Sequence, residues 1–286
     1  MPTLTALAHA KLNLTLDVLG RRSDGYHDLR MVMTSVALAD VITLETGTGD
    51  GVRASANLGF LPTGEKNLAA SALLRFQEAT GRDLGGAHIS LEKHIPVCAG
   101  MGGGSSDAAA VLRALNDCTG AGLSLPELAR VGEAVGSDVP YCVLGGTALA
   151  EGRGEVLTPL APLPRCTVVV CKPNFSISTP ELFRAVDGVR LKCRPDTDGV
   201  LSALEAGDLG GVARRMYNVF EDVLPPRQQA EVRSIRSVLV QHGALGANMS
   251  GTGPTVFGLF DEADRARSAW EELKKTYRDA FLTETV

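Results

Sequence analysis

A glycine run followed by two serines, Gly100 to Ser106, offers main-chain N–H groups rather than side chains for chemistry. It lies within Pro96–Asn116 (PVCAGMGGGSSDAAAVLRALN), after strand-like alternation over His88–Ile95 and before alanine-rich helical sequence. Because glycines lack a Cβ, their N–H groups can turn toward one point and an anion can approach the main chain. A polar residue of Ser105–Asp107 is expected to cap the following helix, whose positive end faces the same point. The pattern predicts a phosphate-binding loop.

Other phosphate-binding motifs fit this run less well. A P-loop requires a lysine directly after the glycines, and none follows here. A dinucleotide fingerprint requires a glycine where Ser105 stands and an acid at the end of the next strand, whereas Glu127 and Glu133 lie in helical sequence. The catalytic-loop and DFG signatures of protein kinases are absent. A tight turn without a ligand is the remaining structural alternative.

Two further polar residues stand in apolar surroundings. Lys11 lies among the leucines of AKLNLTL, and Asp138 lies in GSDVPY. Each has an ordinary interpretation, because a lysine on a strand is usually solvated and an aspartate after Gly-Ser often forms a turn. If the fold brings them together, the ammonium would keep the carboxylate ionised and oriented to abstract a proton from a hydroxyl.

A second glycine turn lies in NMSGTGP, over Ser250, Gly251, Thr252 and Gly253. It is either a hairpin loop or a second set of N–H groups that closes over a phosphate. Tyr26 and His27 form an aromatic pair in a polar turn, where a nucleobase could stack or where the rings are simply at the surface.

Composition limits the classes of function. The net charge is -5, so binding to nucleic acid, which relies on a basic surface, is not expected. The six cysteines show no CxxC spacing and are interpreted as reduced thiols. No basic-apolar leader and no run of about 18 apolar residues occur, which predicts a cytoplasmic protein without a membrane partner. The sequence leaves a monomer and a homodimer open.

The order of elements predicts an α+β fold with mainly antiparallel sheets, because strands and helices mix without strict alternation. A length of 286 residues favours two lobes, and the three prolines of Thr158–Pro164 mark a boundary between domains 1–160 and 161–286. Strands are expected over 8–19, 31–45, 88–95, 167–172, 247–260 (as a pair) and 280–285, with a hairpin over 147–157 and a loop over 47–64. Helices are expected over 67–80, from the glycine loop to 119, and over 124–135, 179–186, 197–205, 209–217, 227–243 and 262–277.

The chain resembles the GHMP kinases, the superfamily of galactokinase, homoserine kinase and mevalonate kinase. AKLNLTL, DGYH, PVCAGMGGGSSDAA, GSDVP and SGTGP occur in the order found there, from Ala10 to about Gly258. DGYH, GSDVP and AEGRGE are most similar to the branch that phosphorylates the 2-hydroxyl of diphosphocytidyl-methylerythritol for isoprenoid precursors. The resemblance implies a two-lobed fold with ATP and Mg²⁺ in a cleft between the lobes.

The resemblance also assigns expected roles to single residues. Asp138 would take the hydroxyl proton, Lys11 would orient both partners, and Ser105 or Ser106 is a candidate ligand for the Mg²⁺ that ATP mainly holds. The residues expected to bind ATP are Pro96, Val97, Cys98, Ala99, Gly100, Met101, Gly102, Gly103, Gly104, Ser105, Ser106, Asn67 and Lys93. The residues expected to bind the cytidyl substrate are Asn13, Tyr26, His27, Thr179 and Phe183, and the phosphate-closing loop is Ser250, Gly251, Thr252 and Gly253.

The sequence departs from its relatives at a few positions in the first loop. Cys98 and Ala99 stand where glycines are common, and Met101 replaces a more usual leucine. Neither change removes a charge. The alternatives to the cytidyl kinase are another GHMP kinase, acting on homoserine or mevalonate, and a nucleotide-binding module without catalysis, which would have no use for Asp138 beside Lys11.

Overall fold

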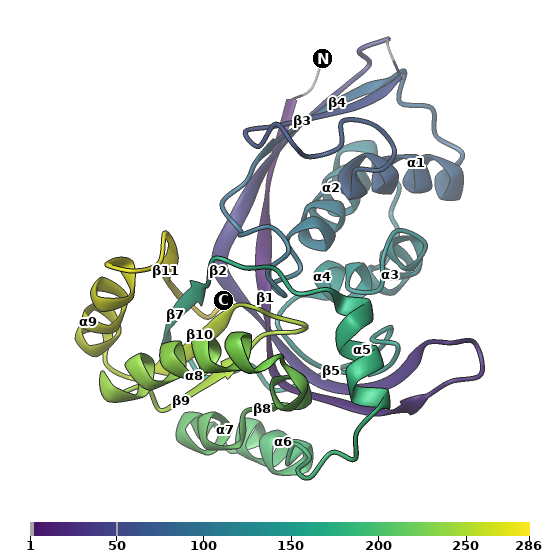
Figure 1. Ribbon diagram of the computed structural model, residues 1–286. Helices are drawn as coiled ribbons and strands as arrows, with labels where there is room; N and C mark the ends of the chain where they lie inside the picture. The colour runs from purple at the N-terminus through teal and green to yellow at the C-terminus, as the bar shows by residue number, and fades with distance from the viewer. Residues whose placement is uncertain (1–2, 50) are drawn as a thin grey trace. The chain divides into compact units, whose positions relative to one another are not determined.

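The structure is a computed structural model that describes residues 3–49 and 51–286 (Figure 1). Residues 1 and 2, at the start of the expected domain 1–160, and residue 50 lie outside the described part. The chain forms two compact units, each built from separate stretches. Unit 1 contains Met1–Ala10, Leu38–Val97 and Gly102–Gly145, and unit 2 contains Lys11–Ala37, Cys98–Met101 and Gly146–Val286. These units differ from the contiguous ranges 1–160 and 161–286, because two long strands contribute to both.

The two long strands are β1 (Thr3–Arg21) and β2 (His27–Thr46), of 19 and 20 residues. Alternation of apolar and polar residues in β1 places Leu12, Leu14 and Leu16 in the core, at 0 to 3% exposure. The polar residues between them, Asn13 and Thr15, are fully buried as well. Since buried polar groups require hydrogen bonds, we expect these two side chains to have hydrogen-bond partners inside the protein.

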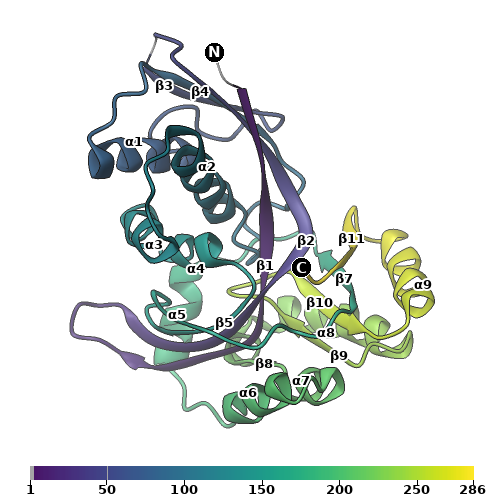
Figure 2. The ribbon, with the colours of Figure 1, turned by 180° about the vertical axis from the view of Figure 1, so that it is seen from behind.

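Unit 1 combines strands with a group of four helices. Its remaining elements are β3 (Val52–Ala56), α1 (Leu68–Thr80), β4 (Ala87–Glu92), α2 (Gly103–Thr119), α3 (Leu125–Glu133) and α4 (Val139–Leu144). β4 pairs antiparallel with the end of β2, where Ile42 faces Leu91, and parallel with β3. The four helices gather on the same side of these strands in both views (Figures 1 and 2).

α2 is the central helix of this group and packs against α1, α3 and α4. Its residues Ala108–Leu112 are 0% exposed, because small side chains let the neighbouring helices approach closely. α1 is stopped by Gly81 in a left-handed conformation, and α3 begins with a capping box of Ser124 and Glu127. α2 itself begins at Gly103, within the glycine run.

Unit 2 contains two sheet regions. The elements that follow unit 1 are β5 (Thr147–Gly152), β6 (Val156–Pro159), β7 (Thr167–Lys172), α5 (Thr179–Asp187), α6 (Thr197–Glu205), α7 (Leu209–Arg215), β8 (Tyr217–Asn218), the 3-10 helix η1 (Val219–Val223), α8 (Pro226–Gln241), β9 (Gly246–Met249), β10 (Val256–Phe260), α9 (Ala263–Lys274) and β11 (Asp279–Glu284). β5 pairs antiparallel with the start of β2 and with β6, and β8 pairs parallel with β1. A separate four-stranded antiparallel sheet has the order β11-β7-β10-β9, and helices α8 and α9 pack against it.

Most expected elements are present, and the α+β class with mainly antiparallel sheets is confirmed. The expectation of a loop over 47–64 was wrong, because β3 lies within it and pairs with β4. α4, β8 and η1 were also missed, since each has only two to six residues and lacks a full period of pattern. All six cysteines are free thiols.

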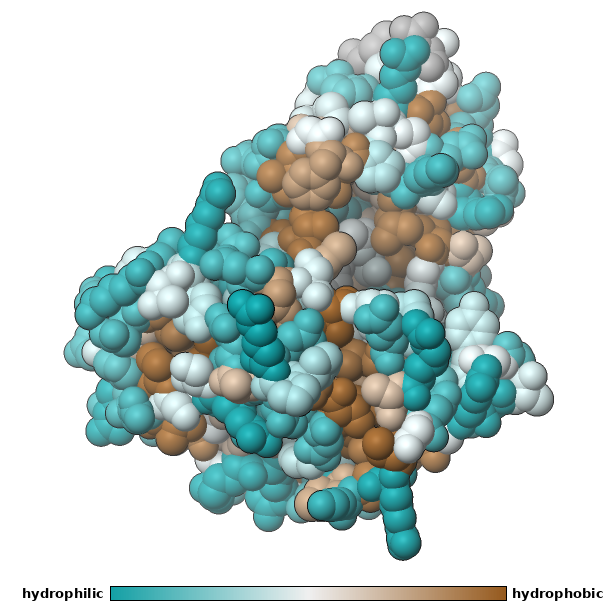
Figure 3. Space-filling view, in the orientation of Figure 1, coloured by the Kyte–Doolittle hydropathy of each residue, from teal (hydrophilic) through white to brown (hydrophobic). Residues whose placement is uncertain are grey.

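The surface is mixed in character. Hydrophilic residues cover most of the face in Figure 3, and hydrophobic residues form smaller groups between them. Across the described residues, no helix combines the length and the apolar character that crossing a bilayer would require.

Candidate active site

The first glycine loop leads directly into α2. Its conformation depends on left-handed backbone at Gly100 (φ 73°) and Gly102 (φ 69°), which glycine adopts without strain. Cys98, where relatives commonly have glycine, also has a positive φ of 52°. The expected cap was wrong, because α2 begins at Gly103 and its N-cap is therefore Gly102. Glycine has no side chain, so no side-chain hydrogen bond caps this helix. The first N–H groups of α2 therefore have no partner within the helix and are available to an anion.

The polar residues after the glycines lie inside the first turns of α2 and bond elsewhere. The Ser106 hydroxyl donates to the carbonyl of His9 at 2.7 Å, within unit 1. The Asp107 carboxylate accepts from Lys93 Nζ at 2.5 Å. Ser105 has no such contact among the described residues, so of the two serines it has the hydroxyl available to a ligand.

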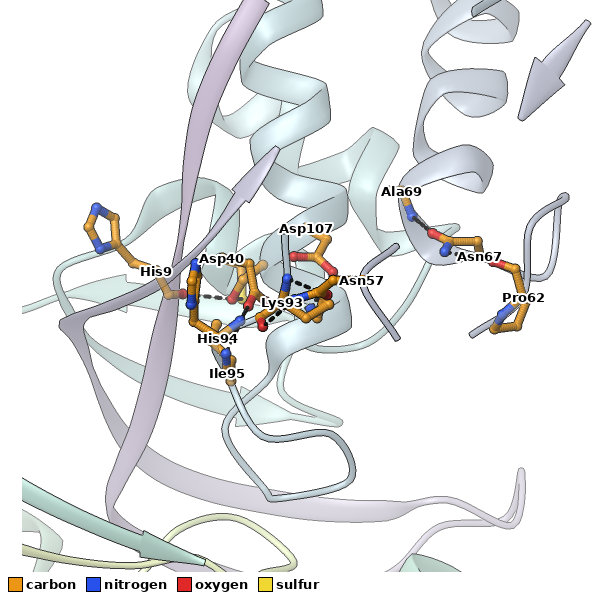
Figure 4. Close-up of polar contacts among 12 residues, drawn as sticks. His9, Asp40, Asn57, Pro62, Asn67, Ala69, Lys93, His94, Ile95 and Asp107 are labelled. Carbon is orange, nitrogen blue, oxygen red and sulfur yellow. Dashed lines mark hydrogen bonds and ion pairs between the residues drawn. The ribbon is translucent and has the colours of Figure 1, made fainter. Parts of the chain in front are cut away.

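Lys93 lies between two carboxylates (Figure 4). Its ammonium contacts both Asp40 and Asp107, and the three side chains are only 0 to 5% exposed. Asp40 also accepts from the main-chain N–H groups of His94 and Ile95, at 2.5 and 2.8 Å. Burial raises the pKa of Asp107 to about 7, against the opposing effect of Lys93 and with a further rise from Asp40. The cluster thus joins the end of β4 to the start of α2 beside the loop.

Asn67, also expected near the nucleotide, is the N-cap of α1. Its side-chain oxygen accepts from Ala69 N–H at 3.0 Å, and its amide donates to the carbonyl of Pro62 at 2.9 Å. Figure 4 shows these contacts at the beginning of α1. Both polar atoms of the Asn67 amide therefore have partners within the protein, and so does the Lys93 ammonium.

The second glycine turn is bound to the first loop within unit 2. The buried Ser250 hydroxyl donates to the carbonyl of Gly100 at 2.9 Å and accepts from the N–H of Asn13 at 3.2 Å. Gly100 has no room for a side chain, since an added Cβ would lie 2.1 Å from the Ser250 carbonyl oxygen. The two turns that the sequence treats separately are thus in contact.

Side chains from β8 and η1 hold the second turn from the other side. The Asn218 amide donates to the carbonyls of Met249 and Gly251, at 2.8 and 2.7 Å. Glu221 accepts from the Met249 N–H at 2.8 Å. Sequence reasoning missed both residues, because they lie about thirty positions away and belong to elements that were not expected.

Lys11 and Asn13 are buried on β1. The Lys11 ammonium donates to the Asn13 side-chain oxygen at 2.7 Å, and the Lys11 N–H donates to the carbonyl of Met101 at 3.0 Å. An added Cβ at Gly251 would lie 3.3 Å from Lys11 Nζ, so the ammonium lies beside the second turn. This arrangement places a positive charge at the contact between the two turns of unit 2.

Asp138 belongs to unit 1 and precedes α4. It is the residue at the N-cap position, with a helical φ and ψ and no side-chain hydrogen bond to the helix. Asp138 lies in a turn directly before the helix, which agrees with its interpretation as a turn former, and the turn has no side-chain cap. Its carboxylate is partly exposed, and its proposed work with Lys11 remains a prediction.

Tyr26 and His27, expected to act as an aromatic pair, lie in different surroundings. Tyr26 is 55% exposed, with the Arg153 guanidinium 5.2 Å from its ring centroid. The His27 ring is buried and stacks on Phe183 of α5, with ring centroids 4.6 Å apart. Among the expected substrate residues, His27 and Phe183 are therefore brought together.

Two further contacts extend this region. His27 Nε2 lies 2.7 Å from Asp187 Oδ1, a partner that sequence reasoning missed. Its only sequence signal is the i,i+4 spacing from Phe183 on α5. Thr179 at the start of α5 shares a 3.0 Å hydroxyl contact with Thr252 of the second glycine turn.

Both parts of the chain match descriptions of a known protein family. The family description "GHMP kinases N terminal domain" matches residues 67–146, and "GHMP kinases C terminal" matches residues 200–279. The 4-diphosphocytidyl-2-C-methyl-D-erythritol kinase of Alkaliphilus metalliredigens (strain QYMF) is 44% identical over 97% of this chain and 95% of that protein. The chain belongs to the 4-diphosphocytidyl-2-C-methyl-D-erythritol kinase family, within the GHMP kinases.

Other members of this kinase family support the assignment over the full length. The protein of that name from Lachnospira eligens is 42% identical over 100% of this chain and 99% of its own. A crystal structure titled 4-(cytidine 5'-diphospho)-2C-methyl-D-erythritol kinase superposes with a TM-score of 0.82 at 36% identity, covering 99% of this chain and 100% of that chain. A homoserine kinase from Cytophaga hutchinsonii has a TM-score of 0.75 at 20% identity, covering 100% of this chain and 95% of that chain, which shows the fold alone. The chain is thus a GHMP kinase, an ATP-dependent phosphotransferase.

Proposed function

We propose that this protein uses ATP to phosphorylate the 2-hydroxyl of 4-diphosphocytidyl-2-C-methyl-D-erythritol, a step toward isoprenoid precursors. The observation that carries the proposal is the identity of 44% and 42%, over nearly the whole chain, with two kinases of that name. The His27–Phe183 stack supports it from the structure, because a substrate with a base needs an aromatic surface and homoserine or mevalonate does not.

Phosphoryl transfer asks a protein mainly for positioning and for positive potential around the transferred group. The first N–H groups of α2 and the glycine loop are proposed to hold the ATP phosphates. The Lys11 ammonium, beside Gly251 in unit 2, is proposed to stabilise negative charge on the transferred group. These local groups supply the potential, so the net charge of -5 is no obstacle.

Asp138 is proposed to take the proton of the attacking hydroxyl, and Asn13, Tyr26, Thr179 and Phe183 to bind the substrate with His27. Lys93 and Asn67 are proposed to support the nucleotide site through their contacts with α2 and α1 rather than through free polar atoms. We also propose that this protein works in the cytoplasm.

The residues present fit a Mg²⁺ ion that the nucleotide itself holds. Among the described residues no group of three His, Cys, Asp or Glu side chains is arranged for a metal. Mg²⁺ commonly binds through substrate phosphates and few protein ligands, and the Ser105 hydroxyl is the one we propose, because Ser106 bonds to His9. When bound, the ion would neutralise charge on the phosphate oxygens.

The test is a product assay that offers the cytidyl alcohol, mevalonate and homoserine in parallel with Mg-ATP. We expect phosphorylation of the cytidyl alcohol alone. Turnover of mevalonate or homoserine instead would replace this function with that of another GHMP kinase. ATP binding without turnover of any alcohol would favour the non-catalytic nucleotide-binding module.

A further inference from the structure

Arg113 connects the middle of α2 to the end of α4. Its Nη1 donates to the carbonyl of Cys142 at 2.5 Å and to that of Val143 at 3.3 Å. Both carbonyls belong to the last turn of α4, where a helix has no partners of its own for such groups. The Tyr141 carbonyl accepts from the Gly145 N–H at 2.7 Å. The main chain and the guanidinium thus share the work of satisfying this helix end.

The guanidinium is a cation in a half-buried position. Burial lowers the pKa of Arg113, while Cys142 and Asp117 have the opposite effect. The position therefore carries a desolvation cost, which the two carbonyls and the negative end of the α4 dipole offset. An apolar side chain could fill the same space without that cost. What distinguishes arginine here is the direction of its hydrogen bonds.

Most of α4 is held by apolar packing. With six residues it is too short to be stable alone, and it packs against α2 and α3 (Figures 1 and 2). An added Cβ at Gly132 of α3 would lie 2.6 Å from Val139 Cγ1, so this contact is tight. Apolar packing keeps helices together but has little direction, whereas a hydrogen bond has a preferred length and angle. The Arg113 contact therefore fixes where α4 lies along its own axis.

α2 and α4 carry two parts of the proposed site, both in unit 1. The ATP phosphates are proposed to bind at the start of α2, and Asp138 directly precedes α4. The Asp138 carbonyl accepts from the Cys142 N–H at 3.1 Å, and Arg113 holds the carbonyl of that same Cys142. Ser106, two turns before Arg113, contacts Cys142 Sγ through its hydroxyl at 3.4 Å. One face of α2 thus holds the helix that begins after the proposed base.

We propose that Arg113 is a positioning residue, which fixes Asp138 at the start of α4 relative to the phosphates at the start of α2. This inference rests on the proposed function, in which Asp138 takes the hydroxyl proton. Transfer requires the hydroxyl, the base and the phosphate in one geometry, and a misplacement of about 1 Å can lower the rate by about 10²-fold. Arg113 then acts on turnover through α4 and not by contact with ATP or the alcohol.

The first experiment compares two variants of Arg113 in the kinase assay. Arg113→Met keeps a long apolar stem and removes the hydrogen bonds, so kcat with the cytidyl alcohol should fall by roughly 10- to 100-fold. KM for ATP and for the alcohol should stay within about two-fold of the parent values. Arg113→Lys should recover most of kcat, because its ammonium can still donate to the Cys142 carbonyl. A parent kcat in Arg113→Met, or no recovery in Arg113→Lys, would overturn the proposal.

The second experiment is a double-mutant cycle with Asp138. In the Asp138→Asn background, Arg113→Met should lower kcat by less than about two-fold, because the group that it positions is already gone. The full loss in both backgrounds would mean that Arg113 acts on another part of the enzyme, against the proposal. Parent turnover in Asp138→Asn alone would instead end the proposed role of Asp138, and with it the reason to position that residue.

Arg82→Met is the matched control in the same unit. Arg82 also binds the last carbonyls of a helix, those of Thr119 and Gly120 at the end of α2, at 2.5 and 3.2 Å. Its replacement should weaken that helix end in the same way and leave kcat unchanged. A loss of kcat as large as that of Arg113→Met would show that any loosened helix end slows this enzyme.

Amide hydrogen exchange tests the contact without a substrate. Arg113→Met should speed exchange in α4 by roughly 10-fold or more, with α1 and unit 2 unchanged, and Arg82→Met should leave α4 unchanged. Unchanged exchange in α4 of Arg113→Met would overturn the proposal, whichever alcohol the enzyme phosphorylates. If Arg113→Met exchanges rapidly throughout the chain, the shorter Arg113→Gln replaces it in all assays with the same expected results.

Discussion

The two glycine turns hold their shape by different means. The first, at the start of α2, relies on local sequence: glycines at positive φ and the beginning of a helix, with no capping side chain. The second, between β9 and β10, relies on distant residues, because Asn218 and Glu221 bind its main-chain groups. Ser250 joins the two. A glycine turn can thus be specified by its own sequence or by its surroundings, and this protein uses both.

The largest expected effect is on the chemical step and not on the two glycine turns. Asp138→Asn preserves size and removes the charge of the proposed base, so turnover should fall by roughly 10²–10⁴ while both turns stay intact. The measurements are kcat with the cytidyl alcohol and, separately, the affinity for ATP, which should not change. Phosphate transfer at the parent rate would show that the hydroxyl proton leaves by another route.

A side chain at Gly100 should disrupt the contact between the turns. In Gly100→Ala the Cβ would lie 2.1 Å from the Ser250 carbonyl oxygen and 2.9 Å from the Gly253 nitrogen, both main-chain atoms. Overpacking of about 1–3 kcal/mol would add to about 1–2 kcal/mol of left-handed strain, and ATP affinity should fall. Denaturant unfolding and nucleotide titration measure the two effects.

The matched control for this variant is Gly120→Ala at the end of α2. Gly120 has a similar φ of 59°, but an added Cβ there would meet nothing within 4 Å. It therefore carries the backbone strain alone. If the two variants lost equal stability and both bound ATP normally, the contact between the turns would have no role in holding the phosphate.

The buried cluster beside the first turn should make stability depend on pH. The folded protein keeps the Asp107 proton up to about pH 7, because burial raises its pKa from the ordinary 3.8. The unfolded chain releases this proton near pH 4, so between these values the folded state binds more protons. The free energy of unfolding should therefore fall as pH rises from about 4 to 7, by about 2–4 kcal/mol.

Denaturant titrations of the parent and of Asp107→Asn at several pH values measure this contribution, which the variant should lack. Asp261→Asn, at an exposed position before α9, is the control and should keep the parent's dependence. An identical pH profile in Asp107→Asn would mean that Lys93 keeps both carboxylates ionised throughout.

The sequence predicted what is local and missed what is distant. The glycine turns, most helices and strands, and the candidates Lys11 and His27 were visible because each depends on a short pattern, whereas Phe183 was named from the family resemblance. The carboxylate partners of Lys93 and His27 were not, since Asp40 and Asp187 lie 53 and 160 residues away from them. The cap of α2 was misassigned because Ser105–Asp107 suit a cap chemically, whereas the helix already begins at Gly103.

The smallest expected effect concerns the hydroxyl that joins the turns. Ser250→Ala removes a fully buried group that donates to Gly100 and accepts from Asn13, and it leaves both main-chain partners unsatisfied. The cost should be about 1–3 kcal/mol in the free energy of unfolding, with weaker ATP binding. Thr255→Val, a few residues away, is the matched control.

The Thr255 hydroxyl is also fully buried but has no hydrogen-bond partner among the residues that the structure describes, so its replacement by an apolar group of the same shape should be neutral or slightly stabilising. Both variants remove one buried hydroxyl next to the second turn, and only one of them removes a link to the first. The difference between them in ATP affinity measures that link. If Ser250→Ala bound ATP as tightly as Thr255→Val, the two turns would act on the nucleotide independently, and the distant residues that shape the second turn would serve the fold and not the phosphate.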